Sequence, residues 1–240
     1  MRFFTAVTAL SSLVAALPSP LEELKTRETI LVESYKAAVE ARGWKSGEGG
    51  TANELLDGGA CPQAIFIHAR GTTEGGNLGT MGNVMGLYLE SKLGAANVWV
   101  QGVGGAYKAA LLDNLLSEGT TQGAIDEMKN LLIRANKNCP NSKIVAAGYS
   151  QGGAVIGAAI RDSSAAIREQ IKGVIMFGWT KSKQNNGKIP NYPVDRLLNY
   201  CESGDLICAG TLIVLPAHLT YHDEAAGPAP EFLLRKIRGQ

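Results

Sequence analysis

A serine flanked by glycines carries the strongest chemical signal in this chain of 240 residues. The run Gly148-Tyr149-Ser150-Gln151-Gly152 directly follows an apolar, β-branched segment and begins a helical pattern. In that context, Gly-x-Ser-x-Gly is typical of a nucleophile elbow, a sharp turn whose small residues lift the serine hydroxyl above the edge of a sheet. We therefore predict that Ser150 is a nucleophile. The alternative is a tight strand–helix turn without chemistry.

The predicted nucleophile needs a base and an acid, and the sequence offers a short choice of each. A serine hydroxyl becomes reactive when a histidine takes its proton and a carboxylate orients that histidine. In hydrolases with this elbow, the acid and then the histidine follow the serine in the chain. Of the two downstream histidines we favour His218, which follows an apolar run. His222 stands among charged residues, where a solvated ring is expected, and His68 lies inside an apolar strand, where a core ring is expected.

The candidate acids downstream of the serine are Asp195, Asp205, Asp223 and a few glutamates. Asp205 lies between Cys201 and Cys208, so a disulfide there would fix its loop. We therefore predict that Asp205 orients the base.

An oxyanion hole is also required, because negative charge develops on the carbonyl oxygen during attack. The backbone N–H after the nucleophile is one donor by geometry, which assigns Gln151. The second donor comes from a loop after an early strand, and the turn at 70–73 fits. Within it Thr72 can offer both its N–H and its hydroxyl, although it could also be an ordinary turn residue.

Alternating strands and helices must position these residues. Short apolar runs predict strands at 64–69, 98–101, 144–147, 173–177 and, less distinctly, 197–200. Amphipathic patterns predict helices at 83–93, 121–137, 152–160 and 231–237. This alternation indicates an α/β fold with a parallel sheet covered on both faces, and such sheets bind ligands at the carboxyl ends of their strands.

The N-terminal part differs in composition from the rest. Residues 1–16 resemble a secretory signal peptide, with Arg2 before a short apolar run and small residues before a cut; a buried helix is the alternative. Residues 17–60 hold five Lys/Arg against eight Asp/Glu, and we interpret them as a propeptide, a packing helix or a cover over an apolar site. The catalytic domain is then expected at 61–240, with an excess of three positive charges.

Composition also limits the partners and the compartment. The net charge of +1, without a basic stripe, disfavours a nucleic-acid binder. No other segment has 18 unbroken apolar residues, so no transmembrane anchor is expected. We expect an exported, extracellular protein, and such a protein can form disulfides. Four cysteines allow three pairings, and the short segment between Cys201 and Cys208 suggests that these two pair with each other. No metal-ligand spacing and no nucleotide loop occur, so we expect no metal and no cofactor.

From about residue 61 to 237 the sequence resembles the fungal cutinases. The matching runs are ARGTTE (69–74), VWVQGVGGAY (98–107), GYSQG (148–152), IPNYP (189–193) and GPAPEFL (227–233). The resemblance implies a compact α/β-hydrolase with a central five-stranded parallel sheet and an active site without a large lid. It implies the pairings Cys61–Cys139 and Cys201–Cys208.

The resemblance also implies roles for individual residues. Ser150, Asp205 and His218 resemble the catalytic triad, and Thr72 and Gln151 resemble the oxyanion donors. Further residues resemble the support of the oxyanion hole (Asn114) and the apolar walls that hold an acyl chain (Leu111, Tyr149, Leu212, Val214 and Leu219). The implied substrates are insoluble cutin and small esters, and we expect a monomer.

Two departures from the family pattern stand out. Thr72 replaces the usual serine, and Ala217 rather than proline directly precedes His218. The alternatives to a cutinase are an acetylxylan esterase on the same fold and a non-catalytic surface-binding protein.

Overall fold

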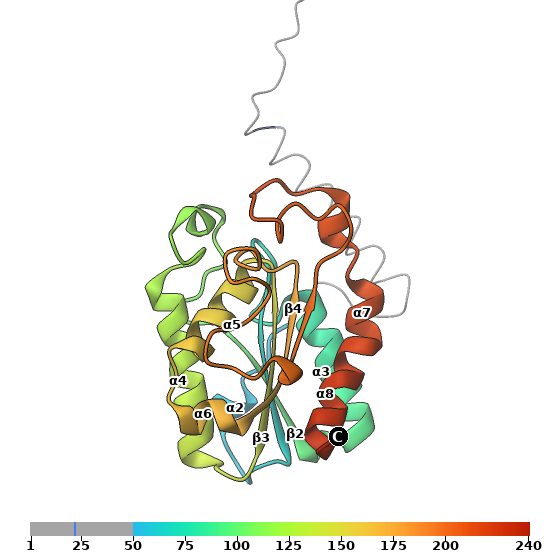
Figure 1. Cartoon of the computed structure of the whole chain (residues 1–240). Helices are drawn as coiled ribbons and strands as arrows, with labels where there is room; N and C mark the ends of the chain where they lie inside the picture. The colour runs from blue at the N-terminus through green and yellow to red at the C-terminus, as the bar shows by residue number, and fades with distance from the viewer. Residues whose placement is uncertain (1–21, 23–49) are drawn as a thin grey trace, which may run out of the picture.

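The computed structural model describes residue 22 and residues 50–240 (Figure 1). The predicted signal peptide at 1–16 and residues 17–21 and 23–49 of the predicted N-terminal extension lie outside the described residues.

In the part of the chain that the structure describes, a parallel sheet of five strands forms the centre, in the order β2-β1-β3-β4-β5. The strands are β1 (Ala64–Ala69), β2 (Val98–Gly102), β3 (Lys143–Tyr149), β4 (Ile171–Phe177) and β5 (Leu197–Tyr200). All five predicted strands are confirmed, and three of them extend by one to three residues beyond the predicted limits. β1 is buried along its whole length, as expected for a strand covered on both faces.

Helices cover both faces of the sheet, as the alternating pattern predicts (Figure 1). On one face lie α4 (Gln122–Asn138), α5 (Gln151–Arg161) and α6 (Ala165–Gln170); on the other lie α3 (Gly79–Leu93), α7 (His222–Ala226) and α8 (Pro228–Arg238). A separate apolar core fills the space on each face. The sequence did not indicate α6 and α7, because five or six residues are too few to show a helical period.

Short elements complete the described chain. They are the helix α2 (Glu54–Asp57) and the 3₁₀ turns η1 (Ala95–Asn97), η2 (Leu111–Leu115), η3 (Val194–Arg196) and η4 (Pro216–Leu219). None of the helices in the described part of the chain has the length and apolar character needed to cross a membrane.

Residues 50–57 pack against the sheet, ahead of the position where the catalytic domain was expected to begin. Leu55 is 1% exposed and joins one of the two cores. Asn53 forms an antiparallel bridge with Gln101 in β2, and the Glu54 carboxylate accepts a hydrogen bond from the Val100 N–H at 2.5 Å. The Gly50 carbonyl accepts a hydrogen bond from the Asn77 N–H at 2.9 Å. This strap therefore covers the outer edge of β2.

Two disulfides have the pairing that the resemblance implies. Cys61 and Cys139 join the start of β1 to the end of α4, and Cys201 and Cys208 close the short loop after β5. In the chain-entropy model, the long loop corresponds to about 4.5 kcal/mol of stabilisation and the short one to about 2.5 kcal/mol.

Candidate active site

Ser150 lies at the turn between β3 and α5, in the conformation of a nucleophile elbow. Its φ of 54° and ψ of −116° are unusual for a residue with a side chain. A Cβ on Gly152 would lie 2.0 Å from the Ala69 carbonyl oxygen, so the turn requires glycine there. The Ser150 N–H donates to the Phe177 carbonyl at 2.8 Å, which ties the turn to the end of β4. Sequence and strand packing thus hold Ser150 at the carboxyl edge of the sheet.

A chain of two hydrogen bonds links the serine to a histidine and a carboxylate. His218 Nε2 lies 2.9 Å from Ser150 Oγ, and His218 Nδ1 lies 2.8 Å from Asp205 Oδ2. All three side chains are 8% exposed or less. This is the geometry in which an imidazole can take a proton from the serine while a carboxylate stabilises the resulting positive charge.

Tyr149, the residue before the nucleophile, holds the histidine from a second side. Its ring stacks on the His218 ring with centroids 5.2 Å apart, and its hydroxyl donates to the His218 carbonyl at 3.0 Å. His218 itself belongs to η4, which begins with Pro216. In the family pattern a proline directly precedes the histidine, whereas here Pro216 lies two residues before His218. Pro216 thus begins the 3₁₀ turn that carries His218.

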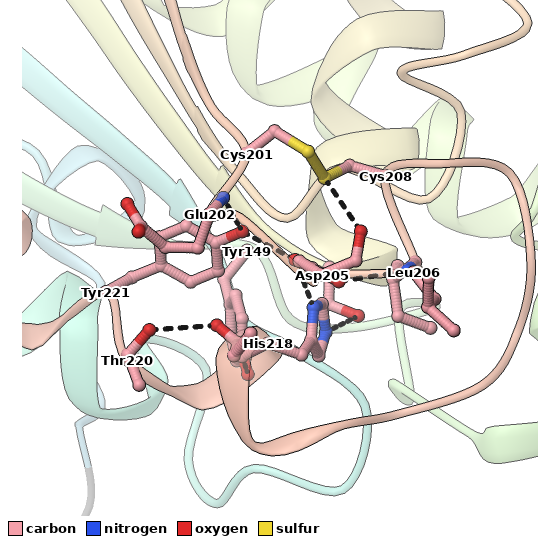
Figure 2. Close-up of polar contacts among 12 residues, drawn as sticks. Tyr149, Cys201, Glu202, Asp205, Leu206, Cys208, His218, Thr220 and Tyr221 are labelled. Carbon is pink, nitrogen blue, oxygen red and sulfur yellow. Dashed lines mark hydrogen bonds and ion pairs between the residues drawn. A yellow bond between two sulfur atoms is a disulfide. The ribbon is translucent and has the colours of Figure 1, made fainter.

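The Asp205 carboxylate accepts three hydrogen bonds (Figure 2). Its Oδ1 accepts from the Ile207 N–H at 2.9 Å, and its Oδ2 accepts from the Tyr221 hydroxyl at 2.5 Å as well as facing His218. Burial alone would raise the pKa of Asp205. The interactions with His218 and the other hydrogen bonds outweigh burial and hold the pKa of Asp205 below its ordinary value, so the carboxylate stays ionised.

Three features surround this carboxylate, and only one of them was recognised from the sequence. The Cys201–Cys208 disulfide closes the loop that carries Asp205, as its position between the cysteines suggested. Gly178, directly after β4, was not singled out. A Cβ there would lie 2.6 Å from His218 Nδ1 and 2.8 Å from Asp205 Oδ2. The contact of Tyr221 with Asp205 was not predicted either, although Tyr221 lies only three residues after His218 in the sequence.

The two predicted oxyanion donors lie at the same edge as the serine. Thr72 follows β1 and Gln151 follows β3, and these strands pair in parallel up to Ala69 and Gly148. Asn114 Nδ2 donates to Thr72 Oγ1 at 3.0 Å, which holds the threonine hydroxyl.

Further hydrogen bonds hold the segments around these donors. The Gln151 side chain donates to the Ala110 carbonyl at 2.8 Å, and the Glu74 carboxylate accepts from the Gly71 N–H at 2.6 Å. The loop after β1 and the start of α5, which carry the predicted donors, are therefore held in place before any substrate binds.

Four of the five predicted wall residues belong to two loops at the same end of the molecule, coloured green and orange-red at the top of Figure 1, whereas Tyr149 is the last residue of β3. Leu111 and Leu212 are 39% and 43% exposed, and Val214 and Leu219 are partly buried. Neighbouring apolar side chains on these loops are also exposed: Leu112, Leu115, Leu116 and Ile213. Exposed apolar residues therefore lie on the loops that carry Asn114 and lead to His218.

The other titratable candidates lie elsewhere. Asp195 belongs to η3, before β5, and His222 and Asp223 begin α7. His68 is fully buried in β1, and this burial lowers its pKa to about 3, so its ring is neutral. Within residue 22 and residues 50–240, no three His, Cys, Asp or Glu side chains gather in a way that could hold a metal ion.

Comparison with known proteins identifies the family. The model of the Cutinase family matches residues 60–237. The chain belongs to the cutinase family. Cutinase 2 of Fusarium vanettenii is 46% identical over 242 residues, covering 99% of this chain and 97% of the relative. A cutinase of Didymella rabiei is 50% identical over 188 residues, covering 77% of this chain and 83% of the relative. As a member of this family, the protein is a carboxylic ester hydrolase.

Solved structures agree with the α/β-hydrolase fold. A Trichoderma reesei cutinase in complex with a phosphonate inhibitor superposes with a TM-score of 0.71 at 29% identity, covering 91% of this chain and 92% of that one. An acetylxylan esterase superposes with a TM-score of 0.60 at 18% identity, covering 74% and 100%, which shows a shared fold and no more.

Proposed function

We propose that this cutinase-family protein is a secreted serine esterase that hydrolyses the ester bonds of cutin and of short-to-medium acyl esters. The observation that carries the proposal is the buried chain of hydrogen bonds from Ser150 Oγ through His218 to Asp205, at 2.9 and 2.8 Å. The names of the relatives supply the polymer, because they are cutinases.

The proposed reaction has two halves that use the same groups. In the first, His218 Nε2 takes the proton of Ser150, whose oxygen attacks the ester carbonyl, and the imidazolium then protonates the leaving alcohol. In the second, His218 activates a water that cleaves the acyl-enzyme. Asp205 stays ionised throughout and stabilises the positive imidazolium.

The backbone N–H groups of Thr72 and Gln151, with the Thr72 hydroxyl, are the proposed donors to the oxyanion. Donors that are already in place cost no reorganisation when charge develops, and one such donor contributes about 3–4 kcal/mol to lowering a barrier. The hydrogen bond from Asn114 supports this role, because it fixes the Thr72 hydroxyl before the substrate binds.

The exposed apolar loops support action on an insoluble substrate. A polymer cannot be enclosed in a deep cavity, so the apolar residues that grip it must lie at the surface. Leu112 and Leu115 are 71% and 70% exposed on the loop that also carries Asn114. We propose that these loops, with Leu111, Leu212, Val214, Leu219 and Tyr149, contact the acyl chain.

Compartment and assembly complete the proposal. Residues 1–16 would direct export, and the segment after them would be a propeptide or N-terminal extension of the catalytic domain. All three members of the proposed triad come from one chain, which supports a monomeric enzyme. Mass spectrometry of the exported protein and light scattering would test these two statements.

The decisive experiment compares substrates and one variant. We expect release of acid from butyrate and longer p-nitrophenyl esters and from a cutin film, and complete loss of this release in Ser150→Ala. Activity confined to acetylated xylan would favour the acetylxylan esterase alternative. A folded wild-type protein without any esterase activity would favour a surface-binding role.

A further inference from the structure

We propose that Tyr221 is a positioning residue for the triad: it holds the Asp205 carboxylate toward His218 and withdraws negative charge from the oxygen that both residues share. The inference rests on the proposed function, in which this carboxylate orients the base. It adds a fourth side chain whose hydroxyl acts on the reaction through Asp205, without contact with the substrate.

The contacts of the Tyr221 hydroxyl give it a single direction. It donates to Asp205 Oδ2 at 2.5 Å and accepts from the Glu202 N–H at 3.1 Å (Figure 2). Because the Glu202 N–H already occupies the phenol oxygen, the phenol proton is left to point at the carboxylate. Burial, and then the hydrogen bond to Asp205, raise the pKa of Tyr221 above its ordinary value, so the phenol remains a donor.

Aromatic packing fixes the ring as well as the hydroxyl. Tyr221 is fully buried, and its ring stands perpendicular to that of His218, with an interplanar angle of 89° and centroids 6.3 Å apart. The ring also packs at 65° on Tyr149 and at 53° on Phe177. A side chain held on three sides cannot swing away, so its hydroxyl is a fixed support for the carboxylate.

His218 and Tyr221 are close in the chain and share one carboxylate oxygen. His218 lies in η4, which ends at Leu219, and Tyr221 immediately precedes α7. The imidazole and the phenol both reach the Asp205 carboxylate, as Figure 2 shows. Oδ2 then divides its charge between the Tyr221 hydroxyl and His218 Nδ1.

Removing the hydroxyl should have two separable effects. Without this donor, Oδ2 carries more negative charge and stabilises protonated His218 more strongly, so the base form is reached at higher pH. We expect the acid limb of the kcat/KM profile of Tyr221→Phe to move up by roughly half a pH unit. We also expect kcat to fall about tenfold with little change in KM, because the freed carboxylate aligns the imidazole less well.

A matched control separates this role from ordinary buried hydrogen bonding. Tyr192 is also buried, and its hydroxyl donates to the Ile171 carbonyl at 3.1 Å, at the start of β4 and far along the strand from the site. Tyr192→Phe removes one buried hydrogen bond by the same chemical change. It should lower the melting temperature without moving the pH profile of p-nitrophenyl butyrate hydrolysis.

The result that overturns the proposal is a folded Tyr221→Phe enzyme whose acid limb and kcat match the wild type, or whose only change is in melting temperature. If that variant does not fold, Tyr221→3-fluorotyrosine keeps the ring and makes the hydroxyl a stronger donor, so its acid limb should move down; an unmoved limb refutes the proposal. Ser150→Ala keeps the two claims apart, because activity retained there would contradict the proposed function instead.

Discussion

Replacing Gly178 with alanine tests how closely the backbone approaches the reacting groups. Gly178 has a φ of 51°, in the left-handed region, and no side chain separates it from the histidine–carboxylate pair. A Cβ would stand 2.6 Å from His218 Nδ1 and Cε1 and 2.8 Å from Asp205 Oδ2. The substitution adds one methyl group at the point where the proposed base is oriented.

The expected magnitude follows from these distances. Ordinary contacts with a Cβ begin near 3.4 Å, so the imidazole must move by about 0.8 Å, and a displacement of about 1 Å in a catalytic geometry can cost about 100-fold in rate. The left-handed backbone adds about 1–2 kcal/mol of destabilisation. We expect kcat to fall by about two orders of magnitude, with a much smaller change in KM.

The assay is steady-state hydrolysis of p-nitrophenyl butyrate, alongside the melting temperature of each variant. Gly239→Ala is the matched control, because Gly239 also has a left-handed φ, 82°, but a Cβ there meets nothing within 4 Å. It should lose stability and keep its activity. A folded Gly178→Ala enzyme with wild-type kcat would refute the reasoning, and so would an equal loss of kcat in the control.

Three further outcomes are expected. The pKa of buried His68 is about 3 in the folded chain but near its ordinary value of 6.5 in the unfolded chain. The contribution of neutral His68 to the free energy of unfolding is therefore complete above about pH 6.5. It is lost as the pH falls toward 3, by at most ~1.4 kcal/mol per pH unit. His68→Gln should flatten this slope in urea unfolding measured from pH 3 to 7, and an unchanged slope would contradict the assignment. Asn114→Ala frees the Thr72 hydroxyl and should lower kcat about tenfold in steady-state assays, whereas an unchanged kcat would mean that this hydroxyl needs no support. Replacing both Cys201 and Cys208 with serine should remove about 2.5 kcal/mol of stability and reduce kcat. Replacing both Cys61 and Cys139 with serine should remove about 4.5 kcal/mol and leave kcat near normal. Equal effects of the two double variants on kcat would show that the loop carrying Asp205 has no special role.

The regular elements were predictable because their patterns are long or strongly apolar. The apolar, β-branched run at 64–69 matches β1 residue for residue, and the less distinct run at 197–200 matches β5. The C-terminal helix was predicted from residue 231 but begins at Pro228, because proline is tolerated in the first turn of a helix. The short helix α7, which follows His218 in the chain, was not predicted, since its five residues do not complete two turns.

Within the site, residues with a local signal were easier to identify than residues defined by tertiary contact. Ser150 stands in a recognisable turn and Asp205 stands between two cysteines, so both could be named from the sequence. Gly178 and Tyr221 have their meaning only through side chains that approach from other segments. A glycine after a strand and a tyrosine near a histidine are common, and neither pattern alone indicates its neighbours.

The contacts of residues 50–57 limit where the proposed propeptide can be cleaved without loss of packing. Removing everything before Cys61 would uncover the core around Leu55 and leave the Val100 N–H without the carboxylate of Glu54. Cutting before Gly50 would keep these contacts and the hydrogen bond to Asn77 beside the oxyanion loop. A cleavage of the proposed propeptide that preserves these contacts must therefore lie upstream of Gly50.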